Sequence, residues 1–220
     1  PLDEGTLVDE WHEAREVVRR IEKEEAGIAD APPIVKLGPE YEPLLIEFLK
    51  DPIVQMSFNT VPTQVAMVEL DKMLVYQKDI DLTHAARIEE RLGGIPDRDE
   101  LFRACLPYDH PRPPAQWCQQ DSETFVFVSP SRDMRSFDPM ALLPQNIQNY
   151  PTSGDLVGIV GLGVGFGSNF LNALYIEDRL ILNNGSHRAF ALRKMGVTHV
   201  PCIVQRIPSR EALNLFAGRE

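Results

Sequence analysis

The spacing of hydrophobic residues divides the first half of the chain into helical segments. Residues 6–25 repeat apolar side chains at intervals of three and four, which predicts an amphipathic helix with a charged face, packed along its apolar side. Residues 41–50 predict a second helix, with Pro43 in its first turn and Pro52 just beyond it. A third helix is predicted over residues 82–92. The apolar positions of the first helix are Leu7, Trp11, Ala14, Val18 and Ile21.

Strand patterns appear in the middle of the chain and dominate its last third. Residues 65–77 contain short alternating and β-favouring runs and are expected to be extended. The later part predicts strands over 124–128, 156–160 and 200–205, a hairpin over 174–182, and helices over 187–195 and 209–216, the last of them capped by Ser209.

Proline sets one stretch apart from the rest. Residues 95–155 contain nine prolines, which predicts a loop-rich insertion with short ordered pieces. The whole pattern predicts an α+β fold, with a small mixed sheet and flanking helices over residues 61–216. Residues 1–60 would form an acidic helical extension before this domain.

The charge distribution bears on possible partners. The chain of 220 residues has 22 basic and 33 acidic residues, a net charge of -11. Residues 156–220 hold seven basic and four acidic residues, a net of +3, so the remainder holds 15 basic and 29 acidic residues. An acidic protein is a poor candidate for non-specific DNA binding, because phosphate neutralisation dominates that affinity. The positive segment fits a small anionic ligand better, although a chance cluster of surface charges is the alternative.

The most distinctive polar segment joins the predicted hairpin to the next helix, and it reads Asn183-Asn184-Gly185-Ser186-His187-Arg188. The backbone N–H groups of a first helical turn carry partial positive charge and favour a phosphate. Gly185 permits close backbone approach, and Arg188 adds a forked, permanently charged donor. Ser186 and His187 supply further donors. The segment therefore predicts an anion-binding site; the alternative is an ordinary turn in which Ser186 caps the helix.

Residues 180–204 resemble the signature of the ParB/sulfiredoxin superfamily. The shared features are a strand, a Gly-X-[His/Arg]-Arg turn, a helix with small residues, a glycine and a Val-Pro strand. Residues 68–77 are more weakly similar to the superfamily's upstream strand and loop. In that superfamily the turn and the helix start bind ATP or CTP. The resemblance implies a ParB/sulfiredoxin-like fold whose nucleotide site consists of Asn184, Gly185, Ser186, His187 and Arg188, approached by Gln77 and Lys78.

The sequence departs from the superfamily at two reactive positions. Ser186 stands where sulfiredoxin has its reactive cysteine, so sulfinic-acid reduction is not supported. Asn184 stands where the ParB-fold serine kinases have an acidic residue, and an amide cannot accept a proton as a general base. A kinase would need another base, for which Asp71, Asp79 and Asp81 are candidates.

Two functions are compatible with these residues. The first is binding of ATP or CTP with Mg²⁺, either alone or as a phosphotransferase or nucleotide hydrolase acting on a small-molecule substrate. His187 and Arg188 are then the candidate catalytic residues. The second is a non-catalytic interaction or regulatory module that keeps the fold, which the two departures favour. A DNA-partition role is disfavoured by the charge and by the short segment after the Val-Pro strand, where ParB proteins place a DNA-reading helix-turn-helix.

Other features carry less weight. The glycines of residues 161–167 fail the spacing of a dinucleotide-binding loop, and they favour close packing of a neighbour over ligand contact. Cys105, His110 and Cys118 match no zinc spacing, so no metal site is expected. His84 would approach the polar turn only if its helix packs beside it. Few cysteines and no long apolar run predict a cytoplasmic protein without a membrane span.

Overall fold

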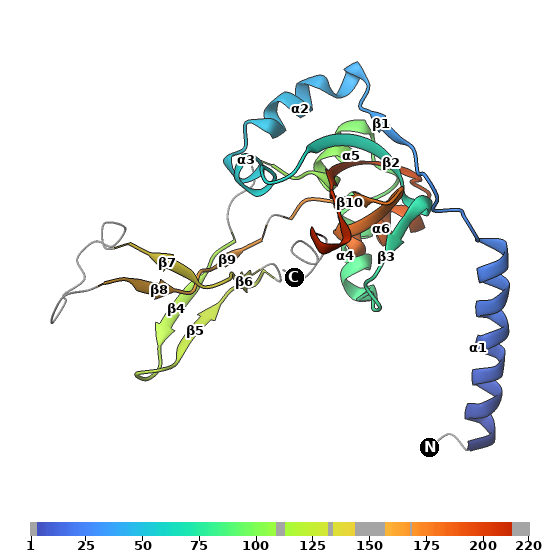
Figure 1. The fold of residues 1–220 in the computed structure, drawn as a ribbon, viewed down its shortest axis with the longest axis horizontal. Coiled ribbons are helices and arrows are strands. Elements are labelled where there is room, and N and C mark those ends of the chain that lie inside the picture. The colour runs from blue at the N-terminus through green and yellow to red at the C-terminus, as the bar shows by residue number, and fades with distance from the viewer. Residues whose placement is uncertain (1–3, 109–112, 132–133, 144–156, 168, 213–220) are drawn as a thin grey trace. The chain divides into compact units, whose positions relative to one another are not determined.

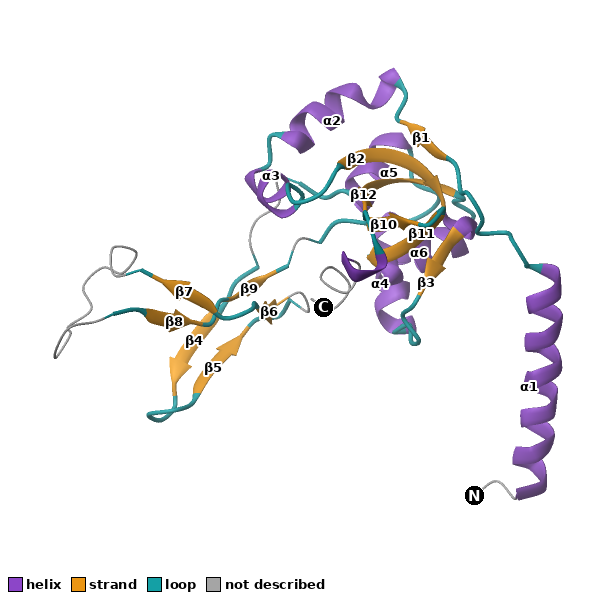
Figure 2. Cartoon of the chain, in the orientation of Figure 1, coloured by secondary structure: helices purple, strands orange, loops and turns teal. Residues whose placement is uncertain are grey.

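The chain forms two compact units. The computed structural model describes residues 4–108, 113–131, 134–143, 157–167 and 169–212 (Figure 1). The first unit consists of residues 1–108 and 170–220, and the second consists of residues 109–169. The secondary structure is mixed α+β, as the sequence predicts (Figure 2).

A six-stranded sheet with the order β1-β2-β12-β10-β11-β3 is the centre of the first unit. β10 pairs in parallel with β12 and β11 pairs in parallel with β3, while the other neighbours are antiparallel. The predicted hairpin is confirmed: β10 and β11 are joined at Glu177 and Asp178, whose φ angles of 46° and 55° are typical of a two-residue type I′ turn. The strands are β1 (Ile34–Lys36), β2 (Thr63–Glu69), β3 (Met73–Val75), β10 (Asn172–Ile176), β11 (Arg179–Asn184) and β12 (His199–Arg206).

The helices begin and end where short side chains and glycine cap them. Asp51, Asp81 and Asp97 each accept a hydrogen bond from a backbone N–H of the helix that follows. Ser209 accepts one from Ala212 in the same way, although the predicted helix 209–216 extends beyond the described residues. The helical elements are α1 (Glu4–Glu24), η1 (Pro39–Tyr41), α2 (Glu42–Leu49), α3 (Pro52–Ser57), η2 (Leu70–Lys72), α4 (Leu82–Leu92), α5 (Arg98–Cys105) and α6 (Ser186–Lys194).

The core of the first unit includes residues from before the boundary predicted at residue 60. Phe48 of α2 is fully buried, and its ring packs edge to face against Phe102 at 6.0 Å and Phe170 at 5.3 Å between centroids. β1 pairs with β2 as an edge strand. The division at residue 60 thus falls inside one hydrophobic core, because β1 and α2 are too short to show by their own pattern what they pack against.

Helix α1 is the part of the first 60 residues that remains exposed. The sequence predicts this helix, and α1 spans Glu4–Glu24. We expected its apolar side to be packed, but its residues 5–24 are all exposed, including Trp11 at 56% and Val18 at 52%. An amphipathic pattern indicates that one face prefers an apolar partner, but it does not specify which partner.

The proline-rich insertion begins later in the structure than the sequence suggests. α5 lies within the predicted range of about 95–155, yet Phe102 and Cys105 are fully buried in the core of the first unit. Asp97 and Glu100 form a reciprocal capping box that starts this helix. The second compact unit is therefore residues 109–169.

The described residues of the second unit form three two-stranded antiparallel sheets, which pair β4 with β5, β6 with β9 and β7 with β8. The glycine run packs against Phe137: a Cβ on Gly163 or Gly165 would lie 3.3 or 3.1 Å from the Phe137 ring. This favours the expectation that these glycines make room for a packed neighbour. The strands are β4 (Gln116–Gln119), β5 (Phe125–Val128), β6 (Met134–Ser136), β7 (Met140–Leu142), β8 (Ile159–Gly161) and β9 (Val164–Phe166).

Candidate functional site

Gly185 joins β11 to α6 in a conformation that favours glycine. Its φ of 98° lies in the left-handed region. A Cβ at this position would lie 2.6 Å from Cδ1 of Leu171, which is fully buried. Both backbone conformation and packing therefore require glycine here, and the turn predicted from sequence is held tightly against the core.

The strand that leads into this turn is irregular. Asn172 pairs with Asn184, but the next residue, Ala173, pairs with Leu182, so Asn183 is an extra residue at a β-bulge. Nδ2 of Asn183 donates to Oδ1 of Asn172 at 2.9 Å. Asn183 and Asn184, the two residues before Gly185, thus fix the geometry of this end of β11.

Helix α6 begins directly after Gly185 without a side-chain cap. Gly185 is the N-cap residue and Ser186 is the first helical residue, so Ser186 is not the cap that the ordinary-turn alternative required. The first intrahelical bond runs from the N–H of Ala189 to the carbonyl of Gly185 at 2.8 Å. The preceding N–H groups of the first turn give this end of the helix its partial positive charge.

Helix α4 runs parallel to α6, so that the two N-termini lie at the same end. The N–H of Asp81, the N-cap of α4, donates to Nε2 of His187 at 3.0 Å. Near the other end, Nζ of Lys194 donates to both carboxylate oxygens of Glu89 at 2.9 and 3.0 Å. The His84 ring lies 5.1 Å from that of His187, edge to face, so α4 does bring His84 beside the turn. The dipole of α6 makes this end favourable for an anion, whereas the Asp81 carboxylate that caps α4 offsets the dipole of that helix.

Arg188 occupies a different position from the one expected of a phosphate ligand. It is only 7% exposed, and its Nη1 donates to the main-chain carbonyl of Cys105 at 3.0 Å. The guanidinium therefore connects α6 to the end of α5. The sequence did not reveal this role, because Cys105 is 83 residues away along the chain.

A cavity of about 550 Å³ opens beside the first turn of α6. Most of its lining side chains are apolar, and Ser186 belongs to the lining. One face of α6 contributes residues 186, 189, 190 and 193 to the cavity. This helical spacing is the only sequence signal that could have indicated which side of α6 forms the cavity wall. The lining residues are Leu70, Met73, Val75, Ile80, Leu182, Ser186, Ala189, Phe190, Arg193 and Lys194.

The two cations of this cavity are paired with carboxylates. Nε of Arg193 donates to Oδ1 of Asp71 at 2.5 Å, and this bond raises the pKa of the guanidinium. Lys194 binds Glu89 as described above. All four side chains are partly exposed, and surface pairs of this kind typically contribute only about 0–1 kcal/mol. A ligand with more charge could replace either carboxylate.

Gln77 and Lys78 do not line this cavity. Both are exposed on the loop between β3 and α4, and Nε2 of Gln77 donates to the carbonyl of Asp79 at 2.7 Å. The same loop contributes Ile80 to the cavity wall instead. Of the candidate bases, Asp71 pairs with Arg193 and Asp81 caps α4.

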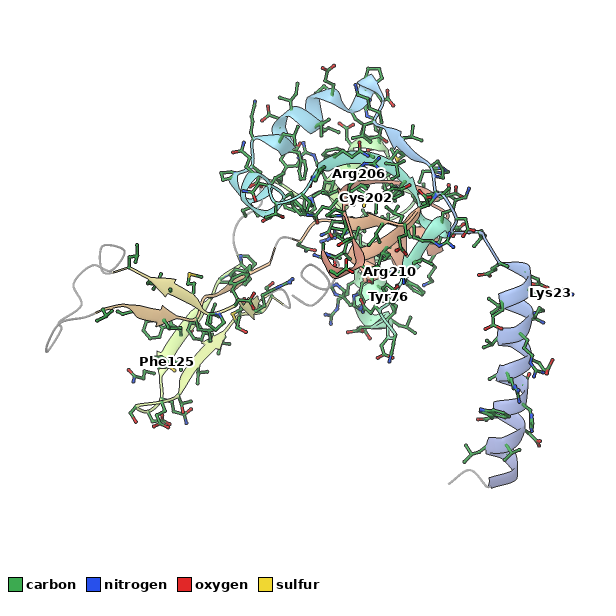
Figure 3. All side chains as sticks on the ribbon, viewed as in Figure 1. Lys23, Tyr76, Phe125, Cys202, Arg206 and Arg210 are labelled. Carbon is green, nitrogen blue, oxygen red and sulfur yellow. The ribbon has the colours of Figure 1, made fainter. Side chains whose placement is uncertain are left out.

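A second cavity, of about 650 Å³, lies by the β10–β11 turn and Tyr76 (Figure 3). Its arginines are also paired: Arg210 binds both carboxylate oxygens of Glu177 at 2.7 and 2.5 Å, and Arg179 pairs with Asp30. No uncapped helix start borders this cavity in the described part of the chain. It is therefore a weaker candidate for an anion.

The three cysteines differ in environment. Burial raises the pKa of the Cys105 thiol to about 12, which the nearby Arg188 partly offsets, and burial also raises that of Cys202. Cys202 lies among the core side chains of the sheet (Figure 3), whereas Cys118 is exposed on β4. His110 lies outside the described residues, and within the described ones no group of three His, Cys, Asp or Glu side chains could hold a metal ion.

We expect thiol reagents to distinguish these cysteines at neutral pH. Cys118 should react rapidly in the native protein, whereas Cys105 and Cys202 should react only after unfolding, because both are shielded and protonated. Counting labelled thiols by mass spectrometry, with and without denaturant, measures this. A Cys118→Ser variant should take up no label in its native state, and rapid labelling of that variant would contradict the buried positions.

No family model, no curated protein and no solved structure matches this chain. The resemblance to the ParB/sulfiredoxin superfamily therefore stays a prediction based on the residues of the turn and helix. In the described residues, no helix is both long and apolar enough to cross a membrane.

Proposed function

We propose that the first unit binds a nucleoside triphosphate, ATP or CTP, with its phosphates at the start of α6. The observation that carries this proposal is the cavity of about 550 Å³ that opens at Ser186, the first residue of a helix without a side-chain cap. Phosphate oxygens accept hydrogen bonds from backbone N–H groups at such a position. The N-terminus of α4 lies at the same end, but the Asp81 carboxylate caps it, so α6 supplies the positive potential.

The cavity suits the base of a nucleotide, which is less polar than its phosphates. Its volume falls within the range of about 300–1,000 Å³ that is usual for small-molecule sites. Its walls are mostly aliphatic, and Phe190, which is 39% exposed, offers an aromatic ring against which a base can stack. A phosphate at Ser186 and a base near Phe190 would lie one helical turn apart along the same face of α6.

Charged groups at the cavity support an anionic ligand. Arg193 and Lys194 belong to its lining and are held only by partly exposed carboxylates. A Mg²⁺ ion would be coordinated by phosphate oxygens and water, as is usual for nucleotide sites, since the described residues contain no cluster of metal-binding side chains.

Specific contacts favour a binding module over a phosphotransferase. Nε2 of His187 accepts the N–H of Asp81, and Arg188 donates to the carbonyl of Cys105. Both candidate catalytic side chains thus serve to join helices. No carboxylate belongs to the described lining of the cavity, and Asp71, a candidate base beside it, is held in its ion pair with Arg193. Nucleotide binding that regulates a partner is the function that these contacts support best.

Nucleotide titration by calorimetry tests the proposal. We expect ATP or CTP with Mg²⁺ to bind the wild type, and we expect Ser186→Glu to weaken binding by at least about tenfold, because its carboxylate would face the phosphates. Ser122→Glu adds the same charge at an exposed position of the second unit and should bind like the wild type.

Three outcomes would count against the proposed function. Absence of binding by the wild type contradicts it directly. Equal loss of affinity in Ser186→Glu and Ser122→Glu would mean that overall charge, not the start of α6, determines binding. Steady release of inorganic phosphate that Ser186→Glu abolishes would show that the site is catalytic and that the binding-module assignment is wrong.

A further inference from the structure

Helix α1 has an apolar seam that nothing in the described chain covers. The seam residues follow one another at intervals of four, three, four and three, which is the heptad spacing of a coiled coil. In heptad terms Leu7, Ala14 and Ile21 occupy d positions, while Trp11 and Val18 occupy a positions. All five are exposed.

The other face of α1 is polar throughout. The outer heptad positions b, c and f between residues 9 and 23 hold no apolar side chain. Glu16 and Arg19 form an ion pair of 2.8 Å on this outer face, and Lys23 projects from it (Figure 3). These outer residues are Asp9, His12, Glu13, Glu16, Arg19, Arg20 and Lys23. With Val8 at e and Val17 at g beside the seam, the helix has one apolar stripe on the side opposite this polar face.

The charges beside the seam fit a second copy of the same helix. In a parallel pair, a residue at g faces the residue five positions later, at e, on the partner. Glu10 at g would then face Arg15 of the second copy, and the symmetry of the pair repeats this contact. In the single chain the Arg15 guanidinium lies over the Trp11 ring, 5.2 Å from its centroid, so it is already next to the seam.

An antiparallel pair would give these charges no attractive partner. In that arrangement a layers pack against d, while e positions face e positions and g positions face g positions. Packing Trp11 against Ala14 would place Glu10 beside Val17 and Arg15 beside Val8, whereas packing Trp11 against Ile21 would place Glu10 beside Glu24 and Arg15 beside Arg15, which repel. The attraction between Glu10 and Arg15 therefore favours the parallel arrangement.

We infer that α1 forms a parallel coiled coil with α1 of a second copy of this chain. The whole helix is only 21 residues long, or three heptads, so the association is moderate and depends on protein concentration. Pairing would bury the five seam residues that the single chain leaves exposed. This inference is independent of the proposed nucleotide site, which α6 and its neighbours form within one chain.

Mass measurement tests the pairing. We expect sedimentation velocity over a range of concentrations to show the full chain passing from one copy to two. Val18→Glu, which places a carboxylate in the seam, should remain a single copy. Arg20→Glu, which places the same residue on the outer face, should associate like the wild type. A wild type that stays a single copy, or a Val18→Glu variant that still pairs, would overturn the inference.

Charge reversal tests the parallel arrangement. Glu10→Arg should weaken association by about tenfold, because two attractive contacts with Arg15 become repulsive. Adding Arg15→Glu to this variant should restore association. If Glu10→Arg instead leaves association unchanged or strengthens it, the helices are antiparallel, since residue 10 would then lie beside Val17 or Glu24, and the inferred arrangement is wrong.

Discussion

Replacing Gly185 with alanine should lower the free energy of unfolding by about 2–4 kcal/mol, as measured by chemical denaturation. A φ of 98° costs a residue with a Cβ roughly 1–2 kcal/mol. The new Cβ would also lie 2.6 Å from Cδ1 of Leu171, and crowding of a packed core adds about 1–3 kcal/mol. Leu171 is fully buried, so its side chain has little room to move away.

Gly196 provides a matched control for this substitution. Its φ of 92° is similar, but a Cβ there would meet nothing within 4 Å. Gly196→Ala should therefore cost only the backbone strain, about 1–2 kcal/mol. The difference between the two variants measures the contact with Leu171. Equal losses in both would show that Leu171 does not constrain the turn.

Replacing Arg188 with alanine should lower the free energy of unfolding by about 2–4 kcal/mol even without any ligand. The variant removes the charged donor from the carbonyl of Cys105, which keeps the N–H of Leu171 as a partner, and it removes a buried side chain from a packed site. Denaturation in urea, followed by circular dichroism, measures the change.

Arg193 is the control for Arg188, because it lies on the same helix but is exposed and paired with Asp71. Arg193→Ala should cost less than about 1 kcal/mol. If Arg188→Ala were as stable as the wild type, Arg188 would not serve the structural role assigned here and would be available to a ligand. Loss of nucleotide binding by Arg188→Ala alone therefore cannot identify a phosphate contact.

Short-range signals allowed several elements to be predicted from sequence. The helix 82–92 was predicted with the bounds of α4, because its apolar residues share one face and Gly93 ends it in the left-handed conformation. The β10–β11 hairpin and the helix after Gly185 were found for the same reason: apolar periodicity and turn residues act within a few positions. The anion-binding character of the turn was also a local inference.

Only the tertiary structure decided which residues far apart in the sequence contact one another. Arg188 has the chemistry of a phosphate ligand, but its position next to the carbonyl of Cys105 gives it a structural role. The wall of the cavity combines β3, β11, α6 and Ile80, which no periodic pattern brings together.

The sequence by itself determined where elements such as α1, α4, α6 and the β10–β11 hairpin lie and that a glycine turn precedes α6, since these depend on backbone preferences and on the periodicity of apolar side chains. Only the tertiary structure decided that Phe48 shares a core with Phe102 and Phe170, and that α1 does not join it. The physical reason is that burial depends on shape and on neighbours far along the chain, whereas periodicity shows only which face of a helix favours burial.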